Sequence, residues 1–134
     1  MKPSLAKGAA RTVKLTVDRG RTIDFMGEAA RVYATPMLVL DLEVACRELL
    51  LEHLDEGEDS VGTRVELDHL AATLLGMTVE LTVTIASVDG RSVAFEFTGS
   101  DGIDTICRGR HHRFVVDVAK TAERLAAKAR KAGL

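Results

Sequence analysis

Aromatic residues and cysteines are scarce in this sequence. Phe, Tyr and Trp together make up 4% of its 134 residues and Trp is absent, whereas apolar residues of all kinds make up 46%. The chain can therefore bury a real core, but that core must be mainly aliphatic. The only cysteines, Cys46 and Cys107, stand alone, with no CxxC pair and no histidine at ligand spacing. This argues against a disulfide framework or a zinc site, so we expect no metal and a reducing, cytoplasmic location.

Long apolar runs, an excess of charge of one sign and familiar catalytic motifs are missing as well. No segment approaches the roughly 18 uncharged apolar residues of a transmembrane helix, and the first residues (MKPSLAKGAARTVK) lack the apolar stretch of a secretory signal. The formal net charge of -2 gives no reason to expect a nucleic-acid partner. No GxSxG, P-loop, GxGxxG or HExxH motif occurs. We interpret residues 1–134 as a single domain that binds neither membranes nor nucleic acids.

Hydrophobic periodicity and turn residues predict the order of the secondary structure. Thr35-Pro36 is a helix start, because threonine is a good N-cap and proline suits the first turn; the apolar run after it predicts a helix to about Leu54. Alternating residues and the turns Asp89-Gly90 and Asp101-Gly102 predict strands elsewhere. The predicted elements are a flexible segment over 1–10, strands over 12–17 and 22–25, the helix over 35–54, strands over 61–71, 77–88, 92–100 and 103–116, and an exposed basic helix over 117–134.

This order predicts an α+β fold in which an antiparallel four-strand meander follows one long helix. The helix is the most apolar in the chain and should be central. A single curved sheet cannot cover such a helix on all sides, so a second copy of the chain is its simplest partner.

Glu43 is out of place on the predicted helix. At about 100° per residue, Asp41, Glu48 and Glu52 share one stripe, which we interpret as the solvated side. Glu43 lies opposite that stripe among apolar residues, where an unpaired carboxylate is costly. Arg47, one turn later, can neutralise it, and Glu43 can also be a nucleophile or general base; the two roles do not exclude each other. The spacing leaves both interpretations open.

The histidines and a threonine are weaker candidates when taken singly. His69 lies in a predicted strand, where a lone histidine is more often structural, and Thr35 is already explained as an N-cap. His111 and His112 are neighbours in the last strand and must point to opposite faces. At most one of them can approach a site, and the sequence favours neither.

Several short segments, in order and with their spacing preserved, carry a family resemblance. They are Ala34–Cys46 (ATPMLVLDLEVAC), Ser60–Thr63 (SVGT), Asp68–Thr73 (DHLAAT), Gly76–Val79 (GMTV) and Gly109–Arg113 (GRHHR). Together, over roughly residues 32–116, they resemble the fluoroacetyl-CoA thioesterase family, a branch of the hotdog-fold thioesterases. The most specific part is the threonine followed eight positions later by Glu-x-Ala-Cys.

The resemblance implies a fold, an activity and a set of site residues. The fold would be a five-stranded antiparallel sheet wrapped around the central helix and doubled by dimerisation. The family's catalytic threonine, glutamate and histidine fall on Thr35, Glu43 and His69. A glycine linked with the thioester site falls on Gly62, and an arginine linked with substrate binding falls on Arg113. Sites in this family lie at the dimer interface, so both chains should contribute to each one.

Two departures from the family bear on the substrate. Pro36 stands where a glycine-like residue is usual, and Met26–Val32 (MGEAARV) lacks the Phe-bearing lid associated with selective fluoroacetyl binding. We therefore expect hydrolysis of a small, ordinary or apolar acyl-CoA. We also expect Glu43 to be buried. CoA is part of the substrate, and no separate cofactor is expected. Whether Thr35 or Glu43 attacks is left open, and so is the association of two dimers into a dimer of dimers.

Other functions remain to be distinguished. A hotdog protein can bind acyl-CoA without hydrolysing it, or act as an enoyl-CoA hydratase, although the hydratase pattern of a nearby Asp and His on the helix is not met by Asp41 and His53. A purely structural dimer would leave Glu43 unexplained. The basic C-terminal helix is either a solvated surface or a contact for CoA phosphates.

Overall fold

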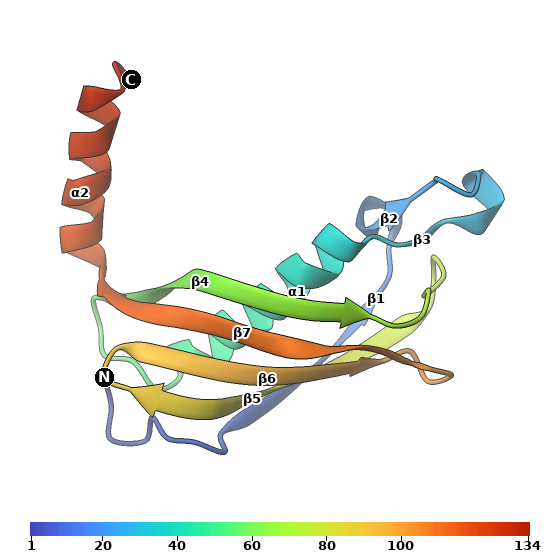
Figure 1. Ribbon diagram of the computed structural model, residues 1–134, viewed down its shortest axis with the longest axis horizontal. Coiled ribbons are helices and arrows are strands. Elements are labelled where there is room, and N and C mark those ends of the chain that lie inside the picture. Colours follow the sequence, from blue (N-terminus) through green and yellow to red (C-terminus); the bar gives the residue numbers. More distant parts are fainter.

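The computed structural model describes all 134 residues, and Figure 1 shows a sheet curved around one long helix with a second helix projecting from one end. The strands are β1 (Ala10–Thr16), β2 (Thr22–Ile23), β3 (Val32–Tyr33), β4 (Glu58–His69), β5 (Thr78–Asp89), β6 (Ser92–Ser100) and β7 (Thr105–Asp117). The helices are α1 (Thr35–Leu51) and α2 (Val118–Lys131), with short 3-10 turns η1 (Arg19–Arg21) and η2 (Glu28–Ala30). The predicted α+β class is confirmed.

Five strands form one antiparallel sheet in the order β1-β5-β6-β7-β4. The predicted four-strand meander is therefore wrong for its first strand, because β4 pairs with β7 at the edge of the sheet and not with β5. Periodicity tells which side of a strand is buried, but it does not name the neighbouring strand. The link over residues 70–77 is too long for a tight hairpin and carries the chain across the sheet.

The core between α1 and the sheet is aliphatic, as composition predicts. It buries one face of α1 against the inward residues of β5 and β6, and two phenylalanines complete it. The main contributors are Leu38, Leu42, Ala45, Cys46, Leu49 and Leu50 from α1, Val79, Leu81, Val83 and Ile85 from β5, and Val93, Phe95 and Phe97 from β6.

The acidic stripe of α1 is exposed at Glu48 and Glu52, as expected, but not at Asp41. Asp41 has an 11% exposed side chain, and its carboxylate accepts a 2.9 Å hydrogen bond from Nε of Arg21. Further along, Glu48 and Glu52 each accept a 3.0 Å bond from the guanidinium of Arg11 on β1. The stripe faces β1, which supplies Arg11, and the segment between β1 and α1, which supplies Arg21. The solvated interpretation is therefore wrong for Asp41.

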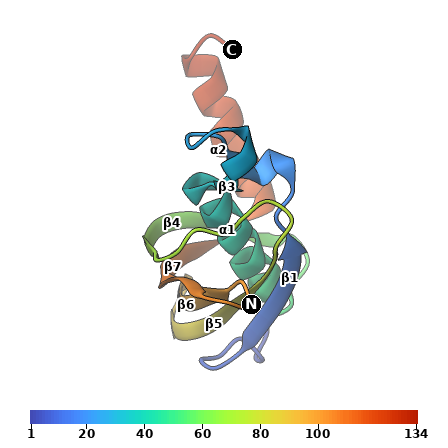
Figure 2. The ribbon, with the colours of Figure 1, turned by 90° about the vertical axis from the view of Figure 1, so that its right-hand side faces the viewer.

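The N-terminal segment is hydrogen-bonded to the rest of the domain, whereas the C-terminal helix projects from it. In the segment expected to be flexible, the Lys2 amide donates to the His53 carbonyl and the Gly8 amide to the Ile85 carbonyl, both at 2.9 Å. At the other end, α2 is capped by Asp117 and buries none of its residues. Figure 1 shows α2 leaving the end of β7, and both views show it extending past the edge strand β4 (Figures 1 and 2). Neither helix is long and apolar enough to cross a membrane.

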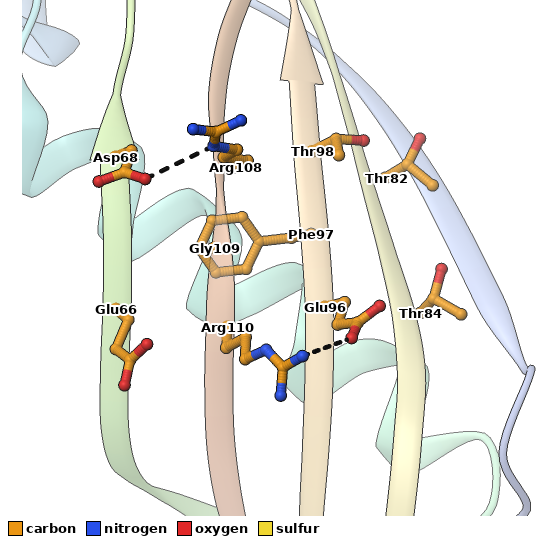
Figure 3. Close-up of a pocket in the computed structure, with 10 residues that line it drawn as sticks. All are labelled: Glu66, Asp68, Thr82, Thr84, Glu96, Phe97, Thr98, Arg108, Gly109 and Arg110. Carbon is orange, nitrogen blue, oxygen red and sulfur yellow. Dashed lines mark hydrogen bonds and ion pairs between the residues drawn. The ribbon is translucent and has the colours of Figure 1, made fainter.

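The outer face of the sheet is polar and hollowed. A depression of about 530 Å³ is lined by side chains from β4, β5, β6 and β7 (Figure 3). Arg108 pairs with Asp68 at 3.5 Å and Arg110 with Glu96 at 3.0 Å, so charges of both signs alternate across it. Because these side chains are more than half exposed, the depression is a solvated face and not a desolvated site.

Candidate functional site

Thr35 is the first residue of α1, and its hydroxyl is not used to cap the helix. Ala34 occupies the N-cap position and makes no side-chain cap bond. The predicted N-cap role of Thr35 is therefore wrong by one residue. Its Oγ1 instead lies 2.7 Å from Nδ1 of His69, the last residue of β4. The hydroxyl thus sits at a helix N-terminus, where unpaired amides and the helix dipole favour negative charge.

His69 is half-buried, which favours the neutral form of its ring. Desolvation by burial lowers the pKa of its ring below the usual value. One ring nitrogen contacts Thr35, whereas the other, Nε2, is buried without a hydrogen-bond partner. The pair borders a mostly apolar cavity of about 360 Å³, whose lining comprises Ile23, Val32, Tyr33, Thr35, His69, Leu70, Ala71 and Ala72.

A bulge in β4 brings Gly62 and His69 to the same side of the sheet. These residues are seven positions apart, so in a regular strand their faces would be opposite. The register between β4 and β7 shifts between Gly62 and Arg64, leaving one extra residue in β4. As a result Gly62 pairs with the buried Arg113 and His69 with the buried Cys107, so both face α1.

Glu43 is paired with Arg113, not with Arg47. Nη1 of Arg113 lies 3.2 Å from Oε1 of Glu43, and the Arg113 side chain is only 3% exposed. Arg47 instead binds Asp59 through two hydrogen bonds of 2.9 and 2.6 Å. The interpretation in which Arg47 neutralises Glu43 is therefore wrong. The Glu43 side chain is 43% exposed in the single chain, so it is less buried than expected.

Gly62 lies directly beneath the Glu43 carboxylate. A Cβ atom at this position would lie 2.9 Å from Oε1 of Glu43, 3.2 Å from Cε1 of His111 and 3.5 Å from Nη1 of Arg113. A hydrogen atom is the largest substituent that leaves the carboxylate where it is. Gly62, Glu43, Arg113 and His111, together with Ser60, are called the Glu43 cluster below.

Sequence reasoning missed Ser60 and left His111 undecided between two neighbours. His111 is 4% exposed and lies 3.1 Å from Arg113, and Ser60 is 6% exposed and accepts a 2.7 Å bond from Nε of Arg113. Strand alternation was the available signal: once Arg113 is placed inside, residue 111 must face inside too and His112 outside. The same alternation places Ser60 on the face of Gly62, but it does not identify Arg113 as the partner of Ser60, because that contact depends on how the strands pair across the sheet.

The two groups of candidates open on different cavities of one chain. The Glu43 cluster borders a cavity of about 270 Å³ that is also lined by Val39, Leu42, Val65 and Phe97. Glu43 follows Thr35 by eight residues of α1, which is about 12 Å along the helix axis. The structure therefore brings Thr35 to His69 and Glu43 to Gly62 and Arg113, but it does not bring these two groups together within one chain.

Neither cysteine has the character of a nucleophile. Both are buried free thiols. Burial raises the pKa of Cys46 to about 12 and that of Cys107 to about 11, so neither forms a thiolate near neutral pH. No three His, Cys, Asp or Glu side chains gather in a group that could hold a metal ion.

Comparison with known proteins identifies the family. Residues 17–119 match the family described as fluoroacetyl-CoA-specific thioesterase. The fluoroacetyl-CoA thioesterase of Streptantibioticus cattleyicolor is 38% identical over 93 residues, which cover 69% of this chain and 67% of that protein. A solved structure of the fluoroacetyl-CoA thioesterase FlK superposes with a TM-score of 0.85 at 30% identity, covering 93% of this chain and 98% of the other.

A thioesterase superfamily member from Thermus thermophilus superposes with a TM-score of 0.87 at 30% identity over the whole of both chains. These likenesses confirm the hotdog fold, and the match over residues 17–119 includes every candidate residue of both groups. The chain belongs to the fluoroacetyl-CoA-specific thioesterase family.

Proposed function

We propose that this chain is an acyl-CoA thioesterase that hydrolyses a small acyl-CoA to a carboxylate and free CoA, using Thr35, Glu43 and His69. Thioesterase activity is the function named for its relatives. The observation that carries the choice of residues is the placement of Glu43. Its carboxylate lies on an otherwise apolar helix face, contacts a buried guanidinium and borders a cavity.

The reaction adds water across the thioester C–S bond and needs no metal, because a thiolate is a good leaving group. Glu43 either attacks the carbonyl carbon or removes a proton from the attacking water. The Thr35 hydroxyl, at the N-terminus of α1, is suited to stabilise the negative oxygen that forms. The neutral His69 ring is hydrogen-bonded to this hydroxyl, and it can assist the transfer of a proton to the departing sulfur.

We further propose that the working form is a homodimer whose sites each combine two chains. Edge strand β4 has no partner on one side, and apolar residues are exposed both on it and on α1: Val65 of β4 is 45% exposed, and Leu40 and Val44 of α1 are 47% and 41% exposed. An isologous pairing of two β4 strands is antiparallel and places the α1 helices antiparallel as well. Thr35 and His69 of one chain then face Glu43 of the other.

The partnerless Nε2 of His69 supports this arrangement. This atom is buried within the single chain, and the His69 residue lines a mostly apolar cavity that offers it no acceptor or donor in the chain. A buried ring nitrogen without a partner is costly, and a carboxylate or a substrate atom supplied across the interface would relieve that cost. Sedimentation of the purified chain should accordingly give the mass of a dimer, and a monomer would contradict the proposal.

We infer that the acyl group is small and need not be fluorinated. The FlK structures include complexes with fluoroacetate and with acetyl-CoA. In this chain Phe25, in the segment before α1, is 80% exposed and does not line the Thr35 cavity, where Tyr33 is the aromatic residue. We also infer a reducing, cytoplasmic location from the two free thiols.

A panel of short acyl-CoAs tests the function directly. The purified chain is expected to release one thiol for each acyl-CoA consumed, measured with a thiol reagent. An enoyl-CoA hydratase would instead change enoyl absorbance without releasing thiol. An acyl-CoA-binding protein would show only thermal stabilisation by the ligand. Either of these last two results, without thiol release, would refute the proposal.

Replacing Gly62 with alanine should separate activity from stability. The new Cβ would be 2.9 Å from Oε1 of Glu43, which is the far end of a flexible side chain. The carboxylate can swing away at little cost to folding, but it then leaves its catalytic position. We expect kcat to fall roughly 10- to 100-fold, with an unfolding temperature near that of the unchanged protein. Full activity in Gly62→Ala would show that the position of the Glu43 carboxylate is not important.

A further inference from the structure

Arg113 uses its donors inside the protein. Its side chain is 3% exposed and its guanidinium is held on three sides. Nε donates to the Ser60 hydroxyl at 2.7 Å and Nη2 to the Ser60 carbonyl at 2.8 Å. Nη1 donates to Nε2 of His111 at 3.1 Å and to Oε1 of Glu43 at 3.2 Å. Ser60 therefore binds one edge of the planar fork in a bidentate manner, and the opposite corner points at His111 and Glu43.

The contacts of His111 fix its tautomer. Its Nδ1 lies 2.8 Å from the carbonyl oxygen of Arg64, which can only accept, so Nδ1 carries the ring proton. Nε2 is then a lone pair and accepts from Arg113. Burial, with a further contribution from the charge of Arg113, lowers the pKa of His111 although the Arg64 carbonyl opposes this. A neutral ring is the state that fits beside a guanidinium.

We propose that Ser60 and His111 are positioning residues that hold the guanidinium of Arg113 against Glu43. The proposal rests on the proposed catalytic role of Glu43. A half-exposed glutamate has several rotamers, and a fixed guanidinium selects the one that keeps its carboxylate over Gly62 at the cavity. Arg113 thereby serves the reaction through Glu43. A side chain 3% exposed, with these donors already bound, is poorly placed to contact CoA phosphates.

A set of three variants tests the role of His111. His111→Phe keeps the ring shape and removes the acceptor, His111→Gln can return an oxygen near the position of Nε2, and His112→Phe changes the neighbouring outward residue as a matched control. For His111→Phe we expect kcat in thiol release to fall roughly 10-fold or more with KM within about twofold, because Glu43 loses its position while substrate contacts remain. His111→Gln should recover most of the loss, and His112→Phe should match the unchanged protein.

An unchanged kcat in His111→Phe would overturn the proposal. If KM rose at the same time, the result would mean that Arg113 binds the substrate directly. Thermal unfolding shows whether the variants are folded. If His111→Phe does not fold, Ser60→Ala removes one of the bonds to Arg113 and should lower kcat in the same way. An unchanged kcat in a folded Ser60→Ala then overturns the proposal. Glu43→Gln is measured alongside as a test of the proposed function. Full activity of Glu43→Gln would refute the catalytic role of Glu43. An inactive Glu43→Gln together with a fully active His111→Phe would refute only the positioning role.

Discussion

Replacing Glu43 with glutamine is expected to lower the rate of thiol release roughly 10²- to 10⁴-fold, the range typical for loss of a general base. An amide neither attacks a thioester nor takes a proton from water. It keeps the size of the carboxylate and an oxygen that can still accept from Arg113. The Glu43 side chain is 43% exposed, but Arg113 is 3% exposed and loses its countercharge, so we expect a loss of about 1–3 kcal/mol of stability in a variant that still folds. Initial rates over a range of acyl-CoA concentrations check this prediction.

Glu48→Gln is the matched control for that experiment. Glu48 lies on the same helix, is paired with Arg11 at 3.0 Å, and has a side chain that is also 43% exposed. It loses the same charge but borders neither candidate cavity. Its activity should therefore stay within about twofold of the unchanged protein. Undiminished turnover in Glu43→Gln would remove Glu43 from the mechanism, and equal losses in both variants would indicate an effect of charge alone.

Replacing Gly109 with alanine is expected to have the largest effect on stability. A Cβ atom at this position would collide with the backbone carbonyl of Glu66 and lie 2.7 Å from Cζ of Phe97, whose ring covers the glycine (Figure 3). The backbone cannot retreat, because Gly109 is paired with both β4 and β6. We expect a loss of about 3 kcal/mol or more, measured by denaturant unfolding.

A second glycine supplies the control for Gly109→Ala. Gly20 lies in η1, and the nearest atom to a Cβ there is a side-chain oxygen of Asp18 at an ordinary 3.6 Å. Gly20→Ala should change stability by less than about 1 kcal/mol in either direction. A Gly109→Ala protein as stable as Gly20→Ala would show that the sheet yields at this point, contrary to the packing described.

Local patterns predicted the elements and marked Glu43, but not its partner. Helix periodicity identifies a carboxylate on an apolar face, because that information lies within a few turns of one helix. Its true partner, Arg113, is 70 residues away in the sequence and reaches Glu43 only through the sheet. The nearer Arg47 was the natural choice from spacing, and it is drawn instead to Asp59 at the start of β4.

Local sequence patterns could not predict the strand order or the bulge in β4 either, because both depend on residues that are distant in the sequence. A single extra residue near Thr63 reverses the faces of the rest of the strand, and no residue type announces it. Without that bulge, Gly62 and His69 could not both face α1. Thr35 and His69 were predicted from family resemblance, and their 2.7 Å contact depends on the displacement of the N-cap to Ala34.

Mixing two inactive variants tests most directly whether one site is built from two chains. Thr35→Ala and Glu43→Gln are each expected to release thiol very slowly on their own. When the two are unfolded together and refolded in equal amounts, half of the dimers are mixed, and each mixed dimer has one site with an intact Thr35, His69 and Glu43. We predict recovery of about a quarter of the activity of the unchanged protein. A refolded mixture that contains mixed dimers but stays as inactive as its two components would contradict the two-chain site.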